Sequence, residues 1–106
     1  MDQLFLISYQ GTITTLRLFE GPSPEDSLRE VATSRACEPN PSWLSLDASR
    51  RVLYCTEGGM VSGMGSLKAF NILPDGTIAE TSEVQTPKGA AHHILYNSGK
   101  TLVAAF

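Results

Sequence analysis

Short runs of alternating apolar and polar residues follow one another along the chain, which is the pattern of half-buried β-strands. Residues 3–9 and 12–19 form the first two runs, and the break at residues 10–11 predicts a hairpin between them. Residues 74–76, Pro-Asp-Gly, predict a tight turn because proline presets φ and glycine accepts a positive φ. Further strands are expected at residues 28–34, 42–46, 51–56, 66–72 and 77–85, and two more within residues 91–106.

One stretch of the chain repeats. Residues 40–57 return 49 residues later as residues 89–106, with Trp43 superposed on His92. Each copy consists of a short apolar segment, a polar turn, a basic residue and a second apolar segment. A period of roughly 40 to 50 residues built from strand, turn and strand is typical of a β-propeller blade. The repeat therefore predicts an all-β chain made of propeller blades.

Counting the expected strands against a four-stranded antiparallel blade divides the chain into three parts. Residues 1–36 are expected to form a partial first blade without its innermost strand, residues 37–87 a complete blade, and residues 88–106 the first half of the next blade. These parts amount to about two blades, which cannot close a ring. We expect the chain either to be truncated or to complete a ring with other chains, and unpaired blade edges could also support self-association.

Charge and hydropathy limit the partners. The net charge of −3 and the lack of any basic cluster beyond Arg50-Arg51 argue against a nucleic-acid partner. No segment approaches the roughly 20 apolar residues of a membrane helix, so no membrane partner is expected. The N-terminus has an acidic residue, Asp2, where a signal peptide has a basic start. The expected localisation is cytoplasmic.

The cysteines and glycines give no sign of a cofactor. Cys37 and Cys55 lack metal-binding spacing, and free thiols in a reducing compartment are favoured over a disulfide. The glycine-rich stretch at residues 58–65 contains no nucleotide-binding motif, and no serine lies in a nucleophile-elbow motif. Two adjacent histidines without a nearby acid or cysteine make a poor zinc site. We therefore expect neither a cofactor nor a metal.

The ordered series PSWLSLDASRRVLY, GSLKAFNI, LPDGTIAE and GAAHHILYNSGKTLVAAF resembles the lactonase family of seven-bladed β-propellers. That family includes propeller-type 6-phosphogluconolactonases and carboxy-cis,cis-muconate cyclases. The N-terminal LFLISYQGTITTLRLF is similar to the opening hairpin of the family, so the resemblance covers nearly the whole chain. It implies that the chain is the N-terminal part of an incomplete seven-bladed propeller. A family histidine at the start of an innermost strand matches His92, whereas Glu57 comes one residue sooner than the family's usual glutamate.

Three residues are candidates for a site in the central channel, which the first strand of each blade lines. His92 is the catalytic candidate, since a neutral imidazole could take a proton from water that attacks a lactone carbonyl. Trp43 could stack on a ring-shaped substrate or fill space near the channel. Glu57 could bind a substrate hydroxyl, although a solvated loop carboxylate is the simpler interpretation. His93 points to the opposite face of its strand and is expected to pack between blades.

The function expected from this resemblance is lactone hydrolysis, with a phosphorylated sugar lactone or a related sugar acid as the small-molecule ligand. A lactonising isomerase of the muconate cyclase type is the first alternative. A non-catalytic binding scaffold is the second, because fold alone does not determine activity. Most of the channel lies outside these 106 residues, so the chain alone is expected to show no appreciable turnover.

Overall fold

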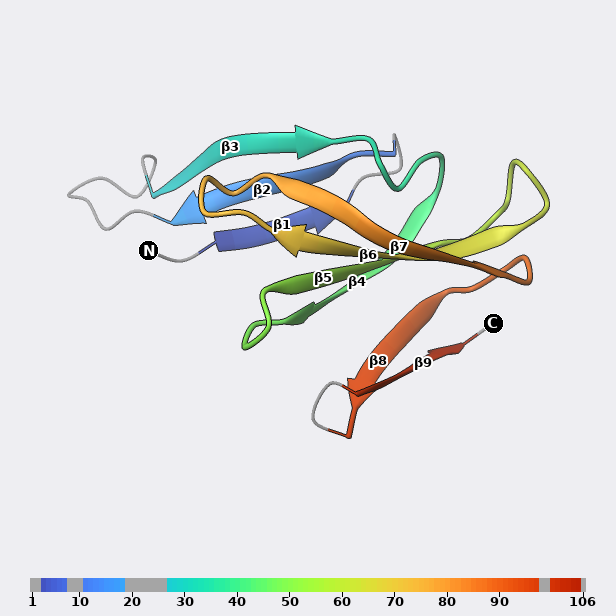
Figure 1. Cartoon of the computed structure of the whole chain (residues 1–106). Coiled ribbons are helices and arrows are strands. Elements are labelled where there is room, and N and C mark those ends of the chain that lie inside the picture. The colour runs from blue at the N-terminus through green and yellow to red at the C-terminus, as the bar shows by residue number, and fades with distance from the viewer. Residues whose placement is uncertain (1–2, 8–10, 19–26, 98–99, 106) are drawn as a thin grey trace.

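The computed structural model describes residues 3–7, 11–18, 27–97 and 100–105. Within these residues the chain folds into nine strands in three antiparallel sheets (Figure 1). The first sheet has the order β1 (Gln3–Ile7), β2 (Ile13–Leu18), β3 (Leu28–Ser34). The second has the order β4 (Pro41–Asp47), β5 (Val52–Glu57), β6 (Gly65–Ile72), β7 (Ile78–Thr86), and the third pairs β8 (His92–Tyr96) with β9 (Thr101–Ala105).

The predicted all-β architecture is confirmed. The N-terminal hairpin is formed by β1 and β2, whose register pairs Ile7 with Ile13. The predicted turn is present as well, because Gly76 has a φ of 91° and its N–H donates to the Leu73 carbonyl oxygen at 2.9 Å. The second sheet is a four-stranded antiparallel meander of the kind that forms a propeller blade. Within the described residues, the second sheet thus has the four strands of a blade, and the first and third sheets have three and two strands.

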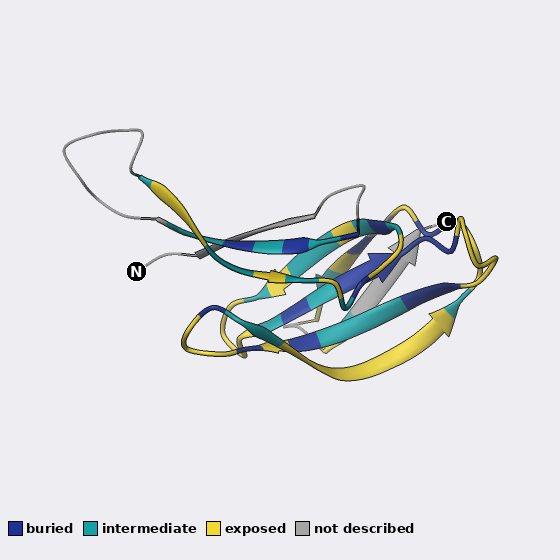
Figure 2. Ribbon diagram, turned by 90° about the horizontal axis from the view of Figure 1, so that it is seen from above, coloured by how far each residue is buried: buried dark blue, intermediate teal, exposed yellow. Residues whose placement is uncertain are grey.

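The apolar core lies between the first and second sheets. Its buried members are Ile13, Cys37, Leu53, Cys55, Phe70 and Ile72. Alternation along the strands selects them, because Leu53 pairs with Phe70 across β5 and β6 and the two side chains therefore share a face. Figure 2 shows the burial concentrated in the inner strands of the second sheet, while the outer strand β7 is exposed along almost its whole length.

The expectation of free thiols is wrong, because Cys37 and Cys55 form a disulfide bond. Cys55 lies on the face of β5 that packs against the first sheet, and the segment connecting β3 to β4 passes over that face. Both cysteine residues are fully buried in the core. Their proximity depends on how two sheets pack, which the spacing of 18 residues along the chain does not reveal.

The 49-residue repeat describes real equivalence between strands. Leu44 on β4 packs against the core toward the first sheet. His93, 49 residues later on β8, faces the second sheet, where its ring bonds to Ser45 and Thr56. Equivalent positions in successive blades thus each face the preceding blade.

The described segments contain no helix of the length and apolarity needed to cross a membrane.

Candidate functional site

The three segments that carry the predicted site residues lie together at one end of the strands of the second sheet. These segments are residues 40–43, 57–59 and 89–92, and we call them the rim. Pro41 at the start of β4 pairs with Glu57 at the end of β5. The Ser42 hydroxyl donates to the Ala90 carbonyl oxygen at 2.8 Å, and that bond joins β4 to the chain entering β8. The rim therefore spans two successive blades.

Backbone hydrogen bonds complete the rim. The Gly58 N–H donates to the Asn40 carbonyl oxygen at 3.0 Å, and the Gly89 N–H donates to the Gly58 carbonyl oxygen at 2.8 Å. Gly59 follows with a φ of 74°, and a Cβ there would lie 2.4 Å from the carbonyl carbon of Met64. Only glycine fits this position. The glycines after β5 therefore serve a close turn at the rim.

Glu57 is part of the rim, but it is not the solvated loop carboxylate that the sequence favoured. Its exposed fraction is 4%, and its Oε1 accepts a hydrogen bond from the Gly59 N–H at 2.8 Å. The carboxylate thus stabilises the turn that follows β5. Its role in binding a substrate stays a prediction.

Trp43 and His92 occupy equivalent places on β4 and β8. Trp43 follows Ser42, whose hydroxyl donates to the Ala90 carbonyl oxygen. Its exposed fraction is 45%, so part of the side chain is available to a ligand. His92 is the first residue of β8, where it pairs with Ala105. The His92 side chain lies outside the described part of the structure. Its catalytic role therefore stays a prediction.

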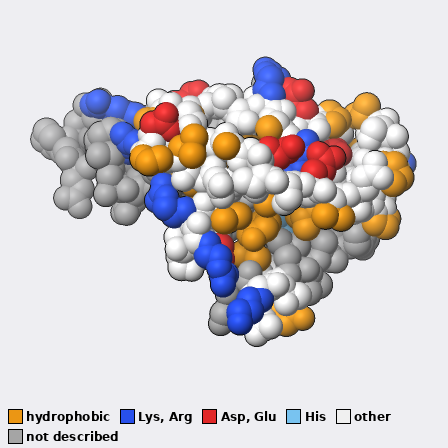
Figure 3. Space-filling model, viewed as in Figure 1, with side chains coloured by type: hydrophobic (Ala, Val, Ile, Leu, Met, Phe, Trp, Pro, Cys, Tyr) orange, Lys and Arg blue, Asp and Glu red, His pale blue; other side chains and the backbone are white. Residues whose placement is uncertain are grey.

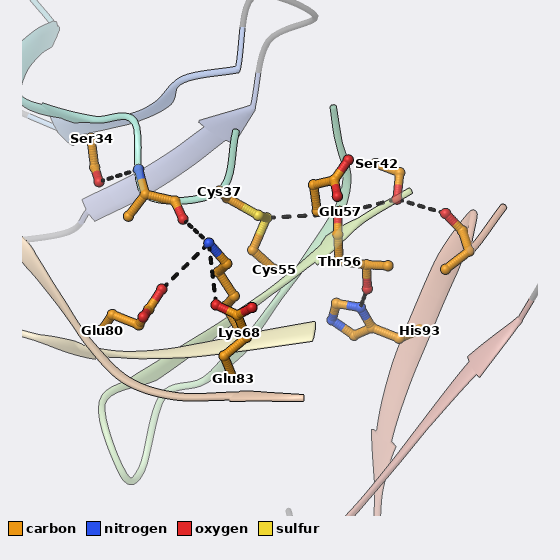
Figure 4. Close-up of a disulfide and its surroundings, with 12 residues drawn as sticks. Ser34, Cys37, Ser42, Cys55, Thr56, Glu57, Lys68, Glu80, Glu83 and His93 are labelled. Atoms are coloured by element: carbon orange, nitrogen blue, oxygen red, sulfur yellow. Dashed lines mark hydrogen bonds and ion pairs between the residues drawn. A yellow bond between two sulfur atoms is a disulfide. The ribbon is translucent and has the colours of Figure 1, made fainter. Parts of the chain in front are cut away.

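His93 lies between the second and third sheets, as predicted. Its exposed fraction is 3%, and its Nε2 lies 2.6 Å from the Ser45 hydroxyl oxygen on β4. Its Nδ1 bonds to the Thr56 hydroxyl on β5 (Figure 4). A neutral imidazole has one donor and one acceptor nitrogen, and hydroxyl groups match either. We call this group the histidine clamp; it fixes β8 against both inner strands of the second sheet.

Sequence reasoning missed Lys68, a cation on the inner face of β6. Its side chain is 16% exposed, and its Nζ donates to the Ala36 carbonyl oxygen at 2.6 Å. The carboxylates of Glu80 and Glu83 lie 3.5 and 3.6 Å from Nζ (Figure 4). The signal in the sequence was a lysine at an inward position of an alternating strand. Its contacts show a structural role, joining the second sheet to the segment before Cys37.

One rim acceptor has no donor in the described residues. The side-chain oxygen Oδ1 of Asn40 is buried and has no hydrogen-bond partner in the described part of the chain, whereas the backbone carbonyl oxygen of the same residue accepts from the Gly58 N–H. Buried polar atoms usually have a hydrogen-bond partner, and Asn40 Oδ1 is an exception within the described residues.

Two carboxylates with a lowered pKa, Asp47 and Asp75, lie at the other end of the strands from the rim. Hydrogen bonds from the Ser49 hydroxyl and from Arg50 lower the pKa of Asp47. Hydrogen bonds from the Thr77 hydroxyl and N–H lower the pKa of Asp75. Both groups stabilise turns. In the part of the chain that the structure describes, no three His, Cys, Asp or Glu side chains gather in a way that could hold a metal ion.

The sheets are antiparallel meanders that follow one another along the chain, and β1, β4 and β8 bring each sheet into contact with the next. This arrangement defines the class of protein, a β-propeller. The profile of the family "Lactonase, 7-bladed beta-propeller" matches residues 5–106, and the chain belongs to that family. No curated protein and no solved structure gives a significant match.

Proposed function

We propose that the rim forms part of the substrate site of a lactone hydrolase. The observation that supports this proposal is the hydrogen bonding of the rim. Ser42 donates to the Ala90 carbonyl oxygen, which joins the segments carrying Trp43 and His92, and the backbone bonds of Gly58 join both to the segment carrying Glu57. Membership of the lactonase family supports the reaction class. The substrate we propose is a sugar lactone of the type that 6-phosphogluconolactonases hydrolyse.

In the proposed reaction, water attacks the lactone carbonyl carbon while the His92 imidazole accepts a proton from that water. The ring C–O bond then breaks, and the proton passes to the leaving alkoxide. Trp43 packs against the sugar ring with its exposed surface.

The charge of the rim explains why we expect no appreciable turnover from the 106 residues alone. Residues 40–43, 57–59 and 89–92 contain no Lys or Arg, whereas a phosphorylated substrate and a developing oxyanion both need positive charge. We propose that those cations come from further blades of the seven-bladed family fold.

Ligand binding tests the proposal directly, because Trp43 is the only tryptophan of the chain and its fluorescence reports on the rim. A neutral, hydrolysis-resistant analogue such as a gluconolactam is a suitable probe, since lactones hydrolyse during a titration and the rim lacks the cations that an anionic ligand needs. We expect a saturable change in emission that His92→Ala weakens at least tenfold. Ile94→Ala is the matched control on β8, because Ile94 is 64% exposed and lies outside the rim. An unchanged emission, or equal binding by the His92 variant, would contradict the proposal.

Activity assays then separate the finer alternatives. A pH-stat follows acid release from sugar lactones, and the loss of muconate absorbance follows the cyclase-type reaction. Muconate turnover without lactone hydrolysis would favour the lactonising isomerase. Ligand binding with neither reaction in a closed seven-bladed form would favour a binding scaffold.

A further inference from the structure

The last three residues of β5 fasten this strand to three different neighbours. Cys55 is bonded to Cys37 in the segment between β3 and β4. Thr56 bonds to His93 on β8. Glu57 accepts from the Gly59 N–H in the turn after β5. The disulfide is the only covalent one of these attachments, and it lies two residues from the rim (Figure 4).

The disulfide joins the segment between the first and second sheets to β5 of the second sheet, at a place that is closed to solvent. Cys37 and Cys55 both have an exposed fraction of 0% and belong to the same apolar cluster as Phe70. The neighbouring Ala36 carbonyl oxygen accepts from Lys68. The segment leaving the first blade is therefore held to the second by a covalent bond and by an adjacent charged hydrogen bond.

We infer that this disulfide is a permanent structural bond and that the protein matures in an oxidising compartment. Stable disulfides are characteristic of exported proteins and rare in a reducing cytosol. Burial keeps a reducing thiolate away from the sulfur atoms. An oxidising compartment differs from the cytoplasmic localisation expected from the sequence, and it does not depend on the proposed function.

Bond formation follows ordinary thiol–disulfide exchange. The thiolate of one cysteine attacks a sulfur atom of an oxidised donor disulfide, which gives a mixed disulfide and releases one donor thiolate. The thiolate of the second cysteine then displaces the other donor sulfur. Cys37 and Cys55 together lose two protons and two electrons, and the donor, a protein or glutathione disulfide, is reduced to two thiols.

The redox state in cells is the direct test. Cells that make the full chain are quenched in acid, free thiols are alkylated under denaturing conditions, and the protein is digested with trypsin. Cleavage after Arg35, Arg50, Arg51 and Lys68 places the two cysteines in separate peptides, residues 36–50 and 52–68. We expect these peptides to be recovered joined. Recovery of both peptides alkylated would overturn the inference.

A second measurement asks whether the bond is permanent. Purified chain is incubated in glutathione buffers at cytosolic and secretory ratios, and remaining disulfide is quantified by the same peptides. We expect the bond to survive in both. Loss of the bond at the cytosolic ratio while the protein stays folded would identify a reversible switch and overturn the inference.

Stability variants show what the bond does. Breaking it is expected to shift the folding equilibrium on the order of a hundredfold toward the unfolded chain. Cys37→Ser with Cys55→Ser should therefore unfold at lower denaturant than the parent and be insensitive to reductant. Leu53→Ala, in the same cluster, is the matched control because it should lower stability yet keep its response to reductant. A parent chain whose denaturant midpoint stays the same with dithiothreitol present throughout the unfolding titration would contradict the inference, because unfolding exposes the sulfur atoms that burial protects in the folded chain.

Discussion

The two faces of the second sheet are held by different chemistry. The face toward the first sheet is apolar and closed, with Phe70 and Leu53 at 0% and 1% exposure and a disulfide beside them. The face toward the third sheet carries the histidine clamp, while Trp43 and Val84 remain 45% and 63% exposed. Figure 3 shows apolar side chains gathered on the surface near the third sheet.

This difference shows how one strand can serve two neighbours. Apolar burial supplies most of the free energy of folding, but it does not depend on direction. Hydrogen bonds to a buried imidazole ring add less free energy, but they fix how one sheet is placed against the next. Residues alternate along β5, so Leu53 and Cys55 support the first interface, and Thr56 supports the second. The second sheet is thus held to the first sheet by apolar packing, and it is aligned with the third sheet by the hydrogen bonds of His93.

The largest effect should come from the apolar face. Phe70→Ala removes a fully buried aromatic ring and should lower the free energy of unfolding by about 3 to 5 kcal/mol. Denaturant titration followed by circular dichroism measures the loss. Val84→Ala on the exposed face is the control and should change stability by less than about 0.5 kcal/mol. Equal losses from both variants would abolish the distinction between the faces.

A smaller and more local effect is expected at the histidine clamp. His93→Leu leaves the hydroxyls of Ser45 and Thr56 without their ring partners and should cost about 1 to 3 kcal/mol. Amide hydrogen exchange should accelerate in β8 and β9 while β5 and β6 keep their protection. Ile94→Ala, on the outer face of β8, should leave exchange unchanged. Uniform acceleration across all strands would show that the clamp supports the whole fold.

Lys68 sharpens the comparison because it is polar yet belongs to the apolar side. Lys68→Met keeps much of the aliphatic stem but loses the bond to the Ala36 carbonyl oxygen, so it should cost roughly 1 to 2 kcal/mol. The same denaturant titration detects the change, and the exposed Lys88→Met is its control. A neutral outcome would assign the first interface to apolar packing and the disulfide alone.

The smallest effect should come from the turn between β6 and β7, where Asp75 is held by local hydrogen bonds. The folded-state pKa of Asp75 lies below the ordinary value of 3.8 because Thr77 donates hydrogen bonds to the carboxylate. This stabilisation is therefore present above pH 3.8 and is lost as the pH falls through the lower folded-state pKa. Asp75→Asn should be slightly less stable than the parent near neutral pH, and the gap should close in acid. A gap independent of pH would rule out this contribution.

The strand pattern, the hairpin and the turn at Gly76 were predictable because alternation and turn chemistry are local properties of the sequence. The position of His93 was predictable for the same reason, since one residue along a strand changes its face. The disulfide, the burial of Glu57 and the contact from Lys68 to Ala36 were not. Each depends on how separate sheets or loops meet, which the alternation of a single strand does not specify.

Hydrogen exchange of the parent chain, resolved by residue, tests the central claim that the second sheet is firmly packed on one face and only positioned on the other. We predict that amides in β5 and β6 exchange slowest and that β8 and β9 open separately, before the rest of the molecule. Equal protection of β8–β9 and β5–β6, lost together in one opening, would contradict the account.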